Sequence, residues 1–348
     1  MVLIILPYFL FWRYLLQELG FTLLNVSPEV KIAGKDYFSA RILGAPAVLL
    51  NFSLIGWLLG REKSTDVLVL FTINCVSNII LDYFFIVHWD WASTGAGAAT
   101  AVSEYLMFFT GIIFILLEGL FPKLWSIAIQ VFDREKMMAM LQLNGDITIR
   151  ILATRLILVI FIDLSASFGT EILAINSLLF QSLVLVSLMT EGVSHATETL
   201  TGNLWGQNLI QQLPGLLRLS SVSGIVLGLV GIAPFILFPH FLFSLFTDHN
   251  EIIDGMGVYL LWLIPFTFAS SLFNVLRGYW LGLTESKVLR NSTIMGSIIG
   301  FFPVALAAMH FHNIHILWLA LCTFLTISVF VMGYKFPHWF SMVKKLET

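Results

Sequence analysis

Long apolar stretches, separated by short polar links, make up most of this sequence. Because a helix needs roughly 20 mostly apolar residues to cross the hydrocarbon core of a bilayer, each such stretch predicts one membrane-spanning helix. Ten stretches qualify, at about 2–24, 37–60, 66–87, 95–118, 138–163, 170–200, 214–246, 256–282, 288–309 and 314–334. The pattern therefore predicts an all-α, polytopic membrane protein.

Composition supports this prediction. Of the 348 residues, 58% are hydrophobic and 11% are charged, and the mean hydropathy is +0.91. A soluble domain carries about 25% charged residues, and its core would not hide so much apolar surface. The net charge of −3 gives no reason to expect a nucleic-acid partner. Cys75 and Cys322 lie inside apolar runs, where each is expected to act as a small hydrophobic residue.

The longest polar link, at 119–137, predicts the boundary between two bundles. We expect an N-terminal lobe of four helices at 1–120, a cytoplasmic linker at 121–137, a C-terminal lobe of six helices at 138–336, and a cytoplasmic tail at 337–348.

Cations are distributed unevenly between alternate links. One side receives Arg61, Lys63, Lys123, Arg134, Lys136, Arg218, Lys287, Arg290, Lys335, Lys344 and Lys345, and the other side receives Lys31 and Lys35. Cytoplasmic loops are enriched in Lys and Arg. The bias predicts a plasma (inner) membrane protein with both termini in the cytoplasm.

A motif recurs at an offset of 222 residues without a gap. The first copy has Glu29, Tyr37, Gly56, Gly60 and Ser64, and the second has Glu251, Tyr259, Gly278, Gly282 and Ser286. Small residues four apart are common in membrane helices because they let backbones approach. That explains the glycines alone, so the shared Glu, Tyr and Ser indicate a duplication.

The offset contains six predicted helices, so both copies would keep the same orientation, related by a pseudo-two-fold axis along the membrane normal. The second copy begins near Met138, and its counterpart would begin roughly 84 residues before Met1. We therefore expect 4 + 6 transmembrane helices of a 6 + 6 pattern, with the first two helices lacking. The alternative is a protein with ten helices by origin.

Ionisable residues at bilayer depth are costly and mark functional sites. Asp82 lies in an apolar span, and Asn78 one turn earlier shares its helical face. A carboxylate and an amide oxygen suit Na⁺, and a carboxyl group held out of water could instead carry a proton. A third possibility is that Asp82 only pairs with an arginine such as Arg41.

The second half carries its own polar rows. Asp146 and Arg150 stand at i, i+4 spacing and are expected to neutralise each other. Glu191, His195 and Glu198 also share one face, which suggests helix packing or a proton relay; no metal site is expected there. Arg41 and Arg277 are expected to form inter-helix salt bridges, with substrate contact as the alternative.

The chain resembles the multidrug and toxic compound extrusion (MATE) family, DinF-like branch. The resembling motifs are Tyr37-x-x-x-Arg41-x-x-Gly44-Ala45-Pro46, Gly56-Trp57-Leu58-Leu59-Gly60, Asn78-x-x-x-Asp82, Gly95-Ala96-Gly97-Ala98-Ala99-Thr100, Asn144-Gly145-Asp146-x-x-x-Arg150, Thr190-Glu191-Gly192, Ala196-Thr197-Glu198 and Arg277-Gly278-Tyr279-Trp280-x-Gly282. The resemblance implies twelve helices in two lobes around a central cavity. It also implies a cation or proton site at Asn78, Asp82 and Thr100, with Asn51 as a neighbour. The branch's first-helix Asp is not in this chain.

These features favour a secondary transporter that exports amphiphilic, often cationic, organic compounds by alternating access, in antiport with Na⁺ or H⁺. The alternatives are a transport-inactive remnant and a lipid-type flippase, which would ordinarily need a cationic cavity. An enzyme is not expected, because the sequence lacks His-Glu-x-x-His, Gly-x-Ser-x-Gly and a phosphate loop. No cofactor beyond the coupling ion is expected, and the chain is expected to act as a monomer.

Overall fold

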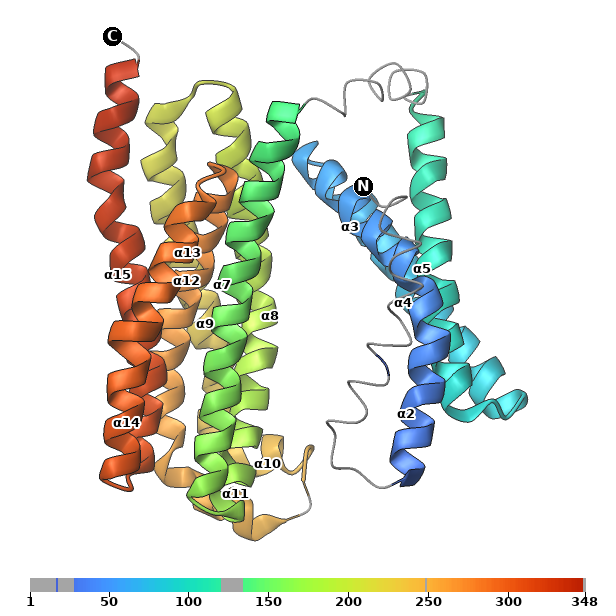
Figure 1. Ribbon diagram of the computed structural model, residues 1–348, viewed down its shortest axis with the longest axis vertical. Helices are drawn as coiled ribbons and strands as arrows, with labels where there is room; N and C mark the ends of the chain where they lie inside the picture. Colours follow the sequence, from blue (N-terminus) through green and yellow to red (C-terminus); the bar gives the residue numbers. More distant parts are fainter. Residues whose placement is uncertain (1–16, 18–27, 120–133, 248, 347–348) are drawn as a thin grey trace. The chain divides into compact units, whose positions relative to one another are not determined.

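The computed structural model describes residues 17, 28–119, 134–247 and 249–346 (Figure 1). The chain divides into two compact units, Met1–Phe132 (unit 1) and Asp133–Thr348 (unit 2). The division falls inside the predicted linker 121–137. Within the described ranges all regular structure is helical.

In unit 1 the described helices form three membrane-length segments, each antiparallel to the one before it in the chain. They are α2 (Pro28–Arg41), a 3₁₀ turn (Ile42–Gly44), α3 (Ala45–Gly60), α4 (Ser64–Asp82), a π-helical segment (Tyr83–His88) and α5 (Ala92–Leu117). A Cβ added to Gly97 of α5 would overlap the backbone carbonyl oxygen of Tyr37, so α2 and α5 touch backbone to backbone. Leu54, Leu58 and Leu70 form the core between α3 and α4.

In unit 2 the long helices run side by side, two of them end to end as one rod (Figure 1). They are α7 (Arg134–Ser167), α8 (Thr170–Gly206), α9 (Leu213–Leu237), α12 (Leu263–Gly282), α13 (Ser286–Met295), α14 (Phe302–His310) and α15 (Ile314–Leu346), with short α10 (Pro239–Phe243) and α11 (Asn250–Gly255) after α9. A π-helical segment, Gly296–Phe301, joins α13 to α14.

Eight helical segments in the described ranges are long and apolar enough to span a membrane. The predicted span 2–24 lies outside the described residues. The predicted span 138–163 is helical within α7, but α7 is not among the eight, because Asp146, Arg150, Arg155 and Asp163 interrupt its apolar run. The chain is a multi-pass, all-helical membrane protein.

Two helix ends differ from the predicted spans. The span 214–246 ends early, at Leu237, because Phe238 leaves the helical conformation and Pro239 starts the separate helix α10. The predicted span 256–282 starts as a pair of 3₁₀ turns, and α12 itself begins at Leu263. The backbone of the predicted tail is helical as far as Leu346, as part of α15.

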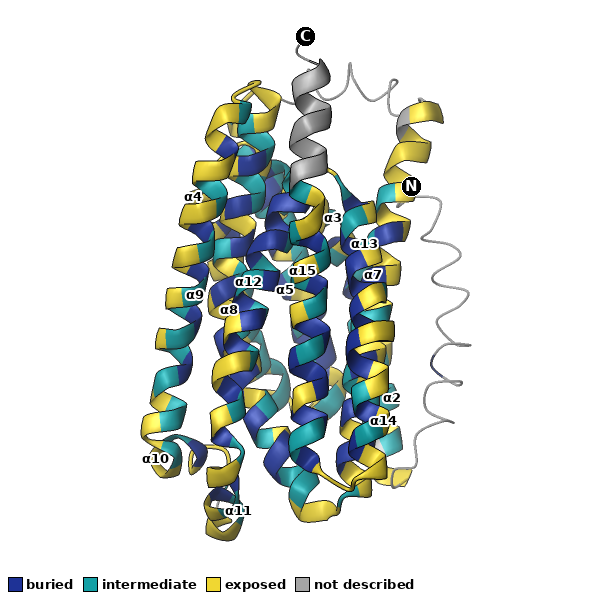
Figure 2. Ribbon diagram, turned by 90° about the vertical axis from the view of Figure 1, so that its left-hand side faces the viewer, coloured by how far each residue is buried: buried dark blue, intermediate teal, exposed yellow. Residues whose placement is uncertain are grey.

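Burial follows the expectation for helices in lipid. Trp280, Trp318 and Tyr279 are fully buried in the core of unit 2, whereas large apolar side chains such as Phe330 and Ile79 are 70% and 68% exposed. Figure 2 shows the alternation along α8 and α9, where buried and exposed residues occupy opposite faces. Continuous exposed apolar surface of this kind suits a hydrocarbon solvent.

Small residues allow α8 and α12 to approach backbone to backbone. A Cβ added to Gly278 would overlap the carbonyl oxygen of Ser194, and one added to Gly282 would overlap that of Glu198. By contrast, a Cβ at Gly56 meets nothing within 4 Å in the described part of the chain. The same glycine motif therefore serves close packing in its second copy but not, within unit 1, in its first.

The offset of 222 residues also relates backbone features of the two units. α3 ends at Gly60 and α12 at Gly282, and positive φ angles of 60° occur at both Glu62 and Thr284. A second pair of positive φ angles, 55° at Asp90 and 45° at His312, keeps the same offset. Shared helix ends and turn conformations at one spacing support the duplication inferred from sequence.

Candidate functional site

In unit 1 a polar cluster joins α2, α3 and α5 at Glu104. The amide of Asn51, 3% exposed, donates from Nδ2 to both the backbone oxygen and Oε2 of Glu104, at 2.9 Å each. Nη2 of Arg41 lies 3.9 Å from Glu104 Oε1. Asn51 is thus held by Glu104, and Arg41 pairs with Glu104 instead of Asp82. Sequence reasoning missed Glu104, although an ionisable residue inside the apolar stretch 95–118 was a sufficient signal.

Asn78 and Asp82 follow each other by one turn on α4. Asn78 Nδ2 and Asp82 Oδ1 are buried and have no hydrogen-bond partner in the described part of the chain. Asp82 is the last residue of α4 before the π-helical segment Tyr83–His88, and π-bulges often occur at functional sites. Leaving a buried carboxylate oxygen unpaired is costly, so this position is suited to a bound proton or cation.

Thr100 does not bond to this pair. Its Oγ1 donates to Ala96 within α5, at 2.8 Å. The register of α4 against α5 is set by Asn74, whose Nδ2 lies 3.6 Å from Met107 Sδ. Because the two helices are antiparallel, moving two turns along each from that contact brings Asp82 to about the level of Thr100. Of the four predicted residues, three lie on packed helices α4 and α5, and Asn51 is engaged elsewhere.

In unit 2 the predicted pair Asp146–Arg150 does not form, and that prediction was wrong. Asp146 Oδ1 binds Arg290 Nη1 at 2.5 Å, and Asp146 Oδ2 accepts from Ser286 Oγ at 2.9 Å. Ser286 and Arg290 stand one turn apart at the start of α13, which packs on α7. Tertiary contact with α13 therefore outcompetes the local i, i+4 pair and leaves Arg150 without its expected partner.

The predicted row on α8 is also divided. Glu191 Oε1 lies 3.2 Å from Arg277 Nη2 of α12, and the same nitrogen donates to Ser194 Oγ at 3.2 Å. His195 Nδ1 and Glu198 Oε2 lie 3.5 Å apart with both side chains exposed. Arg277 thus makes an inter-helix salt bridge, and a relay through all three α8 residues stays a prediction.

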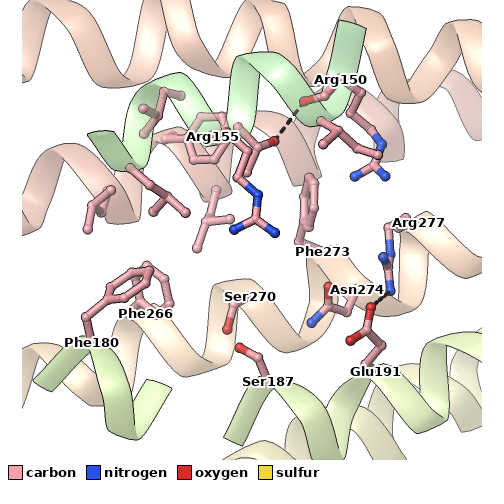
Figure 3. A pocket seen from close by; sticks show the side chains of 17 residues that line it. Arg150, Arg155, Phe180, Ser187, Glu191, Phe266, Ser270, Phe273, Asn274 and Arg277 are labelled. Atoms are coloured by element: carbon pink, nitrogen blue, oxygen red, sulfur yellow. Dashed lines mark hydrogen bonds and ion pairs between the residues drawn. The ribbon is translucent and has the colours of Figure 1, made fainter. Parts of the chain in front are cut away.

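A cavity of about 440 Å³ lies in unit 2 between α7, α8, α12 and α15 (Figure 3). Its charged lining residues are Arg150 and Arg155 from α7, Arg277 from α12 and Glu191 from α8. Phe180, Phe266 and Phe273 supply apolar walls, with Ser187, Ser270 and Asn274 between them. In volume it falls within the range of small-molecule sites.

The fold defines a class: a multi-pass helical membrane protein built from two related helical units. The MatE family model matches residues 147–306. DNA damage-inducible protein F of Escherichia coli is 26% identical over 314 residues, covering 89% of this chain and 67% of that protein. Protein DETOXIFICATION 42 of Arabidopsis thaliana is 25% identical, and the chain spans 56% of its length.

A crystal structure of a mutant Vibrio cholerae MATE transporter, VcmN, superposes with a TM-score of 0.83 at 18% identity, covering 98% of this chain and 77% of that one. That likeness shows the fold. The match to the MatE model and the likeness to DNA damage-inducible protein F make the chain similar in sequence to transporters of the MATE family. Members of this family are transporters and not enzymes.

Proposed function

We propose that this chain exports amphiphilic organic compounds by alternating access, in antiport with Na⁺ or H⁺ bound at Asp82. Similarity to multidrug efflux transporters of the MATE family supports the export of small molecules. The observation that carries the coupling site is the unpartnered Asp82 Oδ1, buried one turn from the unpartnered Asn78 Nδ2.

The residues present fit such an ion. Asp82 Oδ1 is an orphaned hard-oxygen ligand, and a rotation of the Asn78 amide would exchange its nitrogen for its oxygen at the same place. Asp82 would hold the proton or cation and Asn78 would complete the polar face of α4. The bound ion would supply a positive charge to Asp82 Oδ1, which is buried without a partner in the described part of the chain.

Coupling requires that the ion favours one state of the transporter over another. A ligand shifts a conformational equilibrium only by its difference in affinity for the two states. The junction between α4 and the π-helical segment places Asp82 where the backbone hydrogen-bond pattern changes. Occupancy at this junction would supply that difference if the ion binds one state more tightly than the other, since Asp82 lies directly where the α-helical pattern gives way to the π-helical one.

The test is efflux from proteoliposomes that contain the purified 348-residue chain, loaded with a fluorescent amphiphilic dye and given an inward Na⁺ or H⁺ gradient. Asp82→Asn keeps the shape of the side chain but removes its charge, and should abolish acceleration by the gradient. Asp66→Asn is the matched control: Asp66 lies in the first turn of the same helix and pairs with Lys63 at 3.7 Å. Gradient-driven efflux that survives Asp82→Asn would contradict the proposal, as would a wild type that responds to neither gradient.

Placement in the cell belongs to the same proposal. The excess of Lys and Arg on alternate links supports a plasma membrane location with both termini in the cytoplasm. Reporter fusions at each terminus should report the cytoplasmic side, and the chain should elute as a monomer with its detergent. A terminus that reports the opposite side would contradict this topology.

A further inference from the structure

The charge that lines the cavity of unit 2 is unbalanced. Three guanidinium groups, from Arg150, Arg155 and Arg277, face one carboxylate, from Glu191. Figure 3 shows Arg150 and Arg155 projecting from α7 toward the helices that carry Arg277 and Glu191. Glu191 is already engaged by Arg277, at 3.2 Å. The two α7 arginines therefore have no carboxylate of their own at this cavity.

Arg150 is the more unusual of the two. It is only 8% exposed, and its Nε is buried with no hydrogen-bond partner in the described ranges. The charges that act on it most are those of Arg277, Glu191 and Glu198, and Glu198 lies beside His195 at 3.5 Å. A guanidinium is always charged, and burying it without a paired anion is costly. Arg150 is therefore a buried, permanent cation to which an anion from outside the chain can bind.

The remaining lining suits an apolar body. Phe180, Phe266 and Phe273 approach the cavity from α8 and α12, and Leu321 and Phe324 approach it from α15. Arginine binds carboxylate, sulfonate and phosphate oxygens through paired N–H donors. A cavity that has both three arginines and aromatic walls can therefore hold a molecule with an anionic group and an apolar body.

The geometry points to a binding site for an acidic amphiphile: a molecule with one carboxylate, sulfonate or phosphate group, held by Arg150 and Arg155, and an apolar body packed on the phenylalanines. This inference rests on the proposed transport function, since it names the substrate class. It departs from the expectation that the substrates are often cationic. The sequence does not reveal that Asp146 is taken by Arg290, which removes the acid expected beside Arg150.

Equilibrium binding to the purified full chain, in nanodiscs of phosphatidylcholine, tests this site. The probes are a dansyl-labelled alkyl sulfonate and the trimethylammonium compound with the same chain and fluorophore. We expect the sulfonate to bind at least tenfold more tightly than the trimethylammonium probe. Arg150→Gln should weaken sulfonate binding at least tenfold and leave trimethylammonium binding unchanged. Arg150 has no ion pair to lose, so this variant should fold.

Arg218→Gln is the control. Arg218 is an exposed arginine of α9 that does not line the cavity, so its loss changes net charge equally without touching the site. Equal weakening by Arg218→Gln would mean general electrostatic attraction and would overturn the inference. So would unchanged sulfonate binding in Arg150→Gln, or equal binding of the two probes.

The acidic group could belong to a soluble compound or to a lipid. Replacing part of the phosphatidylcholine with phosphatidylglycerol, an anionic lipid, separates these sources. If phosphatidylglycerol abolishes the Arg150-dependent binding of the sulfonate, the site belongs to a lipid headgroup. If that binding is retained, the site belongs to a soluble anion. Both outcomes support the acidic-amphiphile site. Binding is measured without an ion gradient and does not depend on Asp82, so its failure is distinguishable from failure of the proposed antiport.

Discussion

The two copies of the glycine motif make an internal control for helix packing. Gly278 and Gly56 are equivalent at the offset of 222, yet a Cβ at Gly278 would overlap the Ser194 carbonyl and a Cβ at Gly56 would meet nothing within 4 Å. Gly278→Ala must push α8 and α12 apart, because a backbone atom cannot rotate away. Overpacking costs about 1–3 kcal/mol, and we expect the upper part of that range here.

Gly56→Ala should act in the opposite direction. Alanine is favoured over glycine inside a helix by about 0.5–1 kcal/mol. The two identical substitutions should therefore differ by roughly 3 kcal/mol in stability. Gly278→Ala should also weaken the hydrogen bond of 2.5 Å from Ser194 Oγ to the backbone oxygen of Asn274.

Thermal unfolding in detergent, followed by fluorescence-detected size exclusion, measures this difference. We expect a lowered midpoint for Gly278→Ala and an unchanged or slightly raised one for Gly56→Ala. Equal shifts in the two variants, or a neutral Gly278→Ala, would refute the assigned α8–α12 contact.

Two further predictions concern buried polar groups in unit 2. Asp146→Ala removes a charge-assisted contact to Arg290 and a hydrogen bond from Ser286, and should lower the free energy of unfolding by about 2 kcal/mol. This is less than for a fully buried pair, because the Arg290 side chain is 29% exposed. Additive losses of stability in the Asp146→Ala, Arg290→Gln double variant would argue against the pairing. Asn176→Ala should cost about 2–3 kcal/mol, because Asn176 donates to Ser165 Oγ and accepts from Trp318 Nε1 at the core. If urea unfolding shows that Asn176→Ala lowers the free energy of unfolding by less than about 1 kcal/mol, the two hydrogen bonds of Asn176 are not formed.

Much of the fold was predictable because apolar length and turn chemistry are local signals. Eight predicted spans have counterparts among the membrane-length helices in the described ranges, and the duplication reappears in the paired turn angles at Glu62 and Thr284. The break at Phe238 was missed because the apolar run continues through Pro239 without a change in hydropathy. Hydropathy reports whether a segment prefers lipid or water, and it does not report where the helix breaks.

The candidate sites were less predictable because their partners are distant in sequence. Asp146 and Arg290 are 144 positions apart, so no helical spacing could reveal that they exclude the local pair with Arg150. Glu104 was overlooked because it belongs to no quoted motif, although it binds Asn51. Asp82 could be singled out since its signal, a lone acid within an apolar span, needs no partner to be seen.

Reciprocal coupling is the most direct test of the claim that Asp82 links ion movement to export. With no ion gradient imposed, an outward gradient of the fluorescent amphiphile across proteoliposomes should drive ²²Na⁺ or protons inward, because coupling between two ligands acts equally in both directions. We expect this ion flux in the wild type and in Asp66→Asn, and none in Asp82→Asn. Substrate-driven ion flux of normal size in Asp82→Asn would contradict the coupling role of Asp82.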